Sequence, residues 1–114
     1  MTTDRRDKTR FEVRLDAIWD GSRGTYTACV IDLSETGCYV DAINETVPGE
    51  ILHLKIQMQG GEWLELDGEV AHSFTSVGFG LRFVNLNAQK LEMLRGLLVN
   101  LDMSGGKPTE KMRS

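Results

Sequence analysis

Apolar and polar residues alternate along most of the first 84 residues of the chain. The clearest run is FEVRLDAIW, residues 11–19, in which every odd-numbered position is apolar. A period of two is typical of a β-strand that buries one face. Further runs that alternate or are rich in β-branched residues follow at residues 25–31, 38–42, 51–58, 62–70 and 78–84. Turn-forming Gly, Pro, Asp and Ser residues separate these runs, so the pattern predicts six short strands with no helix between them.

The period changes after residue 84. Leucines then recur three or four positions apart, at Leu91, Leu94, Leu98 and Leu101. This spacing predicts one amphipathic helix, for which Asn85 and Asn87 are candidate N-caps. Met93 and Leu97 extend its apolar surface, so the pattern allows either a helix that packs on the core or a helix-mediated dimer.

Six strands without intervening helices favour an antiparallel sandwich or barrel, and a closed barrel removes exposed edges. We therefore predict an all-β fold, a six-stranded antiparallel β-barrel with a C-terminal α-helix. We expect a flexible N-terminal arm at residues 1–10, the barrel and helix at residues 11–103 and a mobile tail at residues 104–114. A chain of 114 residues fits a single domain.

The composition, 40% hydrophobic and 26% charged, is that of a soluble globular protein. No apolar run approaches the roughly 18 residues of a membrane span, and the N-terminus lacks the apolar stretch of a signal peptide. We therefore expect a cytoplasmic protein without membrane insertion, with Cys29 and Cys38 reduced and buried. His53 and His72 lie in apolar-rich stretches without neighbouring metal ligands, so we interpret both as structural and expect no metal.

The chain carries no recognisable catalytic signature. It has no serine in a nucleophile elbow and no Cys/His pair with a local motif. The acidic residues between 62 and 69 could supply a carboxylate pair, but they fit an outward-facing strand row better. We therefore expect a binding protein and not an enzyme.

Two polar stretches are not explained by the fold alone. RRDKTR, residues 5–10, places four cations in six positions of a chain whose net charge is -4, and a solvated arm would account for it. DLSETG, residues 32–37, fits a hairpin connection in which Gly37 supplies the positive φ of the turn. Asp32 and Ser34 also offer an acceptor and a hydroxyl on a rigid turn that a ligand can reach.

Together these stretches resemble the signature of the PilZ domain family. Arg6-x-x-x-Arg10 directly precedes a predicted strand, and Asp32-x-Ser34-x-x-Gly37 follows after the twenty-one residues 11–31. Each motif is weak alone, but the order and the domain size match the family.

Two further observations bear on the resemblance. GFGLRF, residues 78–83, looks like a family feature near the end of the barrel. Arg10 and Arg14 repeat the arginine spacing, but Arg14 lies inside the first strand pattern. Arg6 with Arg10 is therefore the preferred pair.

The resemblance implies a bacterial receptor for cyclic di-GMP. It assigns to the ligand site the residues Arg5, Arg6, Arg10, Asp32, Ser34 and Gly37. An arginine suits both the Hoogsteen edge of guanine and phosphate oxygens, whereas Asp32 would accept from guanine N–H groups and Gly37 would shape the turn. In the family, an arginine at the position of Arg5 is associated with a stacked ligand pair, which implies two cyclic di-GMP molecules per protomer.

The resemblance also implies signalling through an unidentified downstream protein, because the sequence shows no second domain. Ligand binding is expected to order the N-terminal arm, with outputs such as motility, exopolysaccharide production or biofilm formation. One alternative is a PilZ-fold protein-protein adaptor that binds no nucleotide, against which the intact motifs argue. Another is a small nucleic-acid-binding barrel, which the net charge of -4 disfavours. The sequence leaves a monomer or a weak dimer open.

Overall fold

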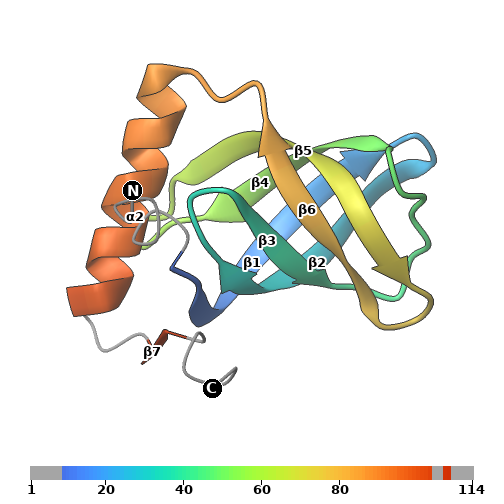
Figure 1. Ribbon diagram of the computed structural model, residues 1–114, viewed down its shortest axis with the longest axis horizontal. Helices are drawn as coiled ribbons and strands as arrows, with labels where there is room; N and C mark the ends of the chain where they lie inside the picture. The colour runs from blue at the N-terminus through green and yellow to red at the C-terminus, as the bar shows by residue number, and fades with distance from the viewer. Residues whose placement is uncertain (1–8, 104–106, 109–114) are drawn as a thin grey trace, which may run out of the picture.

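Six antiparallel strands close into a barrel in the computed structural model, which describes residues 9–103 and 107–108 and the side chains of residues 9–101 (Figure 1). The strands are β1 (Phe11–Gly21), β2 (Gly24–Leu33), β3 (Gly37–Asp41), β4 (Ile51–Gln57), β5 (Trp63–Phe74) and β6 (Gly78–Val84). They are followed by helix α2 (Ala88–Met103) and by a two-residue strand, β7 (Lys107–Pro108), which pairs with the start of β1. The predicted all-β barrel with a C-terminal helix is confirmed.

Strand β1 closes the barrel, because it pairs with β2 on one side and with β4 on the other. The order around the barrel is β1, β2, β3, β6, β5 and β4. β3 pairs with β6 and not with its sequence neighbour β4. Residues 42–50 form the long connection from β3 to β4. Closure protects the strand edges that an open sheet would expose.

Alternating side chains fill the interior of the barrel. Leu54 and Leu66 face each other from β4 and β5, and both are completely buried. Trp19 packs edge-on against Phe79, with 5.2 Å between their ring centroids. Each buried side chain of this size contributes about 1.5–3 kcal/mol to folding. This packing determines which face of every strand points outward, and so which residues can form a surface site.

Helix α2 lies at one end of the barrel (Figure 1). It begins after Asn87, whose Oδ1 accepts a hydrogen bond from the backbone N–H of Lys90 at 2.8 Å, so Asn87 is the N-cap. Leu94, Leu97 and Leu98 are buried in the core cluster. This side of the helix therefore packs against the core, and Leu97 is part of it. Within the described residues, no helix is long and apolar enough to cross a membrane.

Strand β5 runs further than the sequence pattern predicts, to Phe74 and not to Val70. Its pairing with β6 shifts between Val70 and His72, which marks a β-bulge or an equivalent irregularity. Side chains alternate between the two faces of a strand, so one extra residue reverses the face of everything that follows. His72 consequently lies on the exposed outer face.

The two cysteines are free thiols, as expected, but only Cys38 is buried. Burial raises the pKa of the Cys38 thiol to about 12; the positive charge of Arg10 opposes this effect, and the negative charge of Asp32 adds to it. The Cys38 thiol therefore stays protonated and acts as a small apolar side chain. Cys29 is only half-buried, so the prediction of burial is wrong for this residue.

Candidate functional site

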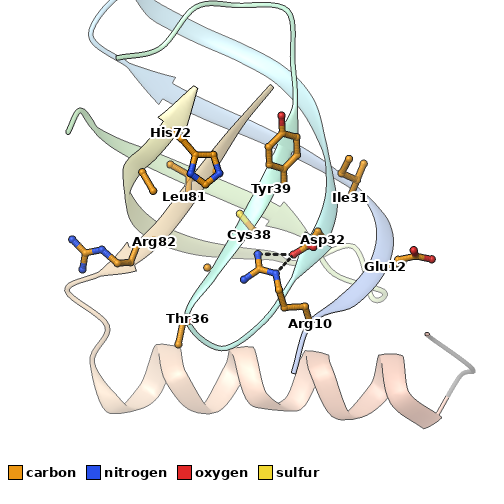
Figure 2. Close-up of a pocket in the computed structure, with 13 residues that line it drawn as sticks. Arg10, Glu12, Ile31, Asp32, Thr36, Cys38, Tyr39, His72, Leu81 and Arg82 are labelled. Atoms are coloured by element: carbon orange, nitrogen blue, oxygen red, sulfur yellow. Dashed lines mark hydrogen bonds and ion pairs between the residues drawn. The ribbon is translucent and has the colours of Figure 1, made fainter. Parts of the chain in front are cut away.

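The pairing of β1 with β2 places Arg10 beside the turn that follows β2. Phe11 lies opposite Leu33, so Arg10, one residue earlier, lies level with Ser34, one residue later. Nε of Arg10 donates to Oδ1 of Asp32 at 2.6 Å, and Nη2 lies 2.6 Å from the same oxygen (Figure 2). Nη1 of Arg10 lies 3.5 Å from Oγ of Ser34. Three of the residues assigned to the ligand site are therefore in contact.

Ser34 stabilises the conformation of the turn between β2 and β3. Ser34 is completely buried. Its Oγ accepts hydrogen bonds from the backbone N–H groups of Thr36 at 3.1 Å and Gly37 at 3.3 Å. Its own backbone N–H donates to the carbonyl oxygen of Gly37 at 2.9 Å. The hydroxyl that the resemblance assigns to a ligand is thus also a structural part of the turn.

Gly37 allows β3 and β6 to approach each other. A Cβ atom at this position would lie 2.1 Å from the carbonyl oxygen of Leu81. Gly37 is not among the glycines with positive φ, so the expectation that it supplies a left-handed turn conformation is wrong. Glycine is needed there because the neighbouring backbone leaves no room for a side chain.

An open cavity of about 920 Å³ lies beside this cluster. Arg10 and Asp32 line it from one end, and Tyr39, His72 and Arg82 line it from β3, β5 and β6 (Figure 2). This volume is within the roughly 300–1,000 Å³ that is typical of sites for small molecules and cofactors.

One row of paired residues crosses the cavity from β1 to β5. Glu12 pairs with Asp32, Asp32 with Tyr39, Tyr39 with Gly80, and Gly80 with His72. Of this row, only Asp32 was predicted from the sequence as a ligand-site residue. His72 was interpreted as structural, because it lies in an apolar-rich stretch without neighbouring metal ligands.

The full charges in the cavity lining balance, because Arg10 and Arg82 are matched by Glu12 and Asp32. Arg10 pairs with Asp32, and Arg82 pairs with Glu69, which lies outside the lining. A ligand with two negative charges therefore needs cations from elsewhere in the chain. Arg5, Arg6 and Lys8, which the sequence places just before this site, lie outside the described residues.

His53 belongs to a separate cluster on β4 and β5. Its Nδ1 lies 2.9 Å from Oδ1 of Asp67, and its Nε2 lies 2.9 Å from Oε1 of Glu65. The hydrogen bond to Asp67 raises the pKa of His53; partial burial opposes this effect, and the hydrogen bond to Glu65 raises the pKa further. Across the described part of the chain, no three His, Cys, Asp or Glu residues are grouped so that they could hold a metal ion.

Comparisons with known proteins bear on the family and the fold of the chain. The model of the PilZ domain family matches residues 4–100. No curated protein sequence matches the chain.

Solved structures share its fold at low sequence identity. The PilZ domain of YcgR from Escherichia coli with c-di-GMP (cyclic di-GMP) superposes with a TM-score of 0.75 and 16% identity, covering 96% of this chain and 98% of that chain. The PilZ domain of CeSA from a cellulose-synthesizing bacterium gives a TM-score of 0.68 and 18% identity over 82% and 97% of the two chains. The inhibitor of motility MotI from Bacillus subtilis gives a TM-score of 0.73 and 16% identity, and the match covers 86% of this chain but only 51% of MotI.

Proposed function

Because the chain belongs to the PilZ domain family, whose model matches residues 4–100, we propose that it is a receptor for cyclic di-GMP. The observation that carries the proposal is the contact of Arg10 with Asp32 and Ser34 at the edge of an open cavity. A related fold in the YcgR domain, solved with c-di-GMP, supports the choice of ligand.

The chemistry of the ligand suits the polar end of the cavity. Cyclic di-GMP carries two phosphodiester charges and two guanines, each with acceptors on its Hoogsteen edge. Both contacts of Arg10 with Asp32 go to Oδ1 of the carboxylate. A carboxylate has about four acceptor positions on its two oxygens, so Oδ2 can accept guanine N–H groups while the ion pair stays intact. Arg6 would then bind the Hoogsteen edge or a phosphate through its planar guanidinium group.

The N-terminal arm supplies the positive charge that the described lining lacks. Arg5, Arg6 and Lys8 precede Arg10 directly, so they can reach a ligand that lies beside it. Binding of a dianion would order this arm over the cavity and change the surface that a partner protein meets. Amide hydrogen exchange at residues 4–10 tests this step, because exchange should slow when cyclic di-GMP is added. Equal exchange with and without ligand would argue against it.

Arg5 bears on stoichiometry. In the PilZ domain family, an arginine at this position is associated with binding of a stacked pair of ligand molecules. We therefore propose two cyclic di-GMP molecules per protomer. Calorimetry of Arg5→Ala should then give a lower stoichiometry than the wild type. One ligand per chain in both proteins would contradict the proposal.

The proposed role is that of a cytoplasmic receptor that acts through a downstream protein. Motility, exopolysaccharide production and biofilm formation are the outputs that the family resemblance suggests.

Competition binding tests the proposed ligand against the alternatives. Labelled cyclic di-GMP should bind and be displaced by unlabelled cyclic di-GMP, and random oligonucleotides should not displace it across a range of salt concentrations. Asp32→Ala should lose this binding, and Asp16→Ala, which removes an exposed carboxylate from the same barrel, should keep it. Displacement by oligonucleotides would favour a nucleic-acid-binding barrel, and absence of binding would favour an adaptor.

A further inference from the structure

Two consecutive outward-facing positions of strand β6 are glycines. Gly78 and Gly80 flank the buried Phe79, so side chains at their positions would point outward. A Cβ atom on Gly80 would lie 2.6 Å from Nε2 of His72, and one on Gly78 would lie 2.9 Å from Cε2 of Tyr39. Two rings therefore occupy the space above β6 that the strand's own side chains would otherwise fill.

The rings come from the strands on either side of β6. Tyr39 belongs to β3, and His72 belongs to β5. The His72 ring is exposed, and its centroid lies 5.5 Å from that of Phe74, whose ring is tilted against it. Partial burial and the Asp41 carboxylate raise the pKa of Tyr39, so its phenol is neutral at physiological pH. Figure 2 shows both rings at the end of the cavity away from Arg10.

We propose that Tyr39 and His72 form a stacking platform for a nucleobase and that Gly80 is present so that the His72 ring can lie over β6. The inference rests on the proposed function and names the part of the cavity that receives a guanine face. Arg10 and Asp32 then bind the phosphate and the base edge at the other end. Every base has a π-face, so a platform of this kind adds affinity for any planar base, whereas Asp32 reads the identity of the base.

Substitutions that remove or keep the rings test the platform by calorimetry with cyclic di-GMP. Stacking of one base on an aromatic ring is worth about 1–3 kcal/mol, so His72→Ala should weaken binding by about 5- to 100-fold. His72→Phe keeps a planar ring and should restore most of the affinity. Tyr39→Phe should bind like the wild type, whereas Tyr39→Ala should show a loss similar to that of His72→Ala.

Gly80→Ala tests the role of the glycine through a double-variant cycle. The nearest atoms to its added Cβ all belong to the His72 side chain, and Gly80 has no left-handed φ. Gly80→Ala should therefore weaken binding in the wild type and cause no further loss in His72→Ala. Gly78→Ala is a poorer probe, because its Cβ would also lie 2.3 Å from the carbonyl oxygen of Val40. If the double variant Gly80→Ala, His72→Ala loses affinity by the product of the two single losses, Gly80 does not act through the His72 ring.

A direct contact completes the test. Nuclear Overhauser effects between guanine H8 and the ring protons of His72 are expected in the wild-type complex. Wild-type binding that changes by less than about two-fold in His72→Ala and Tyr39→Ala would overturn the platform and leave the proposed function intact. No binding of cyclic di-GMP by the wild type would overturn the proposed function and the platform together. Urea unfolding of each variant shows whether a loss of binding is a loss of fold.

Discussion

Nε of Arg95 lies 3.1 Å from Oε2 of Glu35, so helix α2 is joined by an ion pair to the turn between β2 and β3. The same turn carries Ser34, which lies two residues after Asp32 at the edge of the cavity. Figure 1 shows this turn beside the helix at one end of the barrel. A ligand that moves the turn would therefore act on α2 through Arg95.

The Arg95–Glu35 contact predicts that ligand binding changes amide exchange in α2. We expect cyclic di-GMP to slow exchange in the helix of the wild type and to have a smaller effect in Arg95→Ala. The side chain of Arg95 is 53% exposed, so its loss should lower the free energy of unfolding by no more than about 1 kcal/mol. Lys90→Ala, on the same helix, is the matched control, and equal responses in the two variants would contradict the coupling.

Ser34→Ala should lower the free energy of unfolding by about 1–3 kcal/mol, because it leaves the N–H groups of Thr36 and the buried Gly37 without their acceptor. Urea denaturation measures this difference. Thr27→Ala, at an exposed position of β2, should change stability little. Equal stability of Ser34→Ala and the wild type would mean that water replaces the hydroxyl and that the turn does not depend on it.

Gly37→Ala should destabilise the barrel strongly, by about 2 kcal/mol or more, because its Cβ would overlap the backbone at Leu81. Gly60→Ala provides the control, since a Cβ there has no heavy atom within 4 Å. Thermal unfolding of the two variants should separate them clearly. Similar midpoints would show that β3 and β6 can move apart without cost.

His53 should make stability depend on pH. Its pKa is raised in the folded state by Asp67 and Glu65, so the stabilisation is complete below the unfolded pKa of about 6.5 and is lost as pH rises through the folded value. His53→Gln should therefore destabilise the protein more at about pH 5.5 than at about pH 8.5. Urea titrations at the two pH values measure the difference, and Asp67→Asn should reduce it. A pH-independent effect of His53→Gln would argue against the ion pairs.

The fold was predictable because hydrophobic periodicity records which face of each element is buried. The alternation in β1 and the three-to-four spacing in α2 predicted a barrel and its helix correctly. The face of His72 was not predictable, because the irregularity after Val70 reverses the alternation and no residue in the sequence marks it. The sequence therefore missed the exposed ring that lines the cavity.

The site was predictable only in part. The motif spacing predicted that Asp32 and Ser34 share a turn, whereas Asp32 lies in β2 and only Ser34 belongs to the turn. Strand pairing brings Arg10 to both residues. The reason for Gly37 could not be predicted, since it depends on the approach of β6, a strand more than forty positions later in the chain. The roles of Arg5 and Arg6 stay predictions, because these residues lie outside the described part of the chain.

Isothermal titration calorimetry with cyclic di-GMP decides whether this protein is a receptor for that nucleotide. We predict saturable binding to the wild type. Affinity should fall by at least about ten-fold in both Arg6→Ala and Asp32→Ala, because charge-assisted hydrogen bonds are worth about 1.5–3 kcal/mol each. Arg6→Lys should also bind weakly, since a point charge cannot replace a planar donor pair. No binding by the folded wild-type protein would contradict the claim that this chain is a cyclic di-GMP receptor.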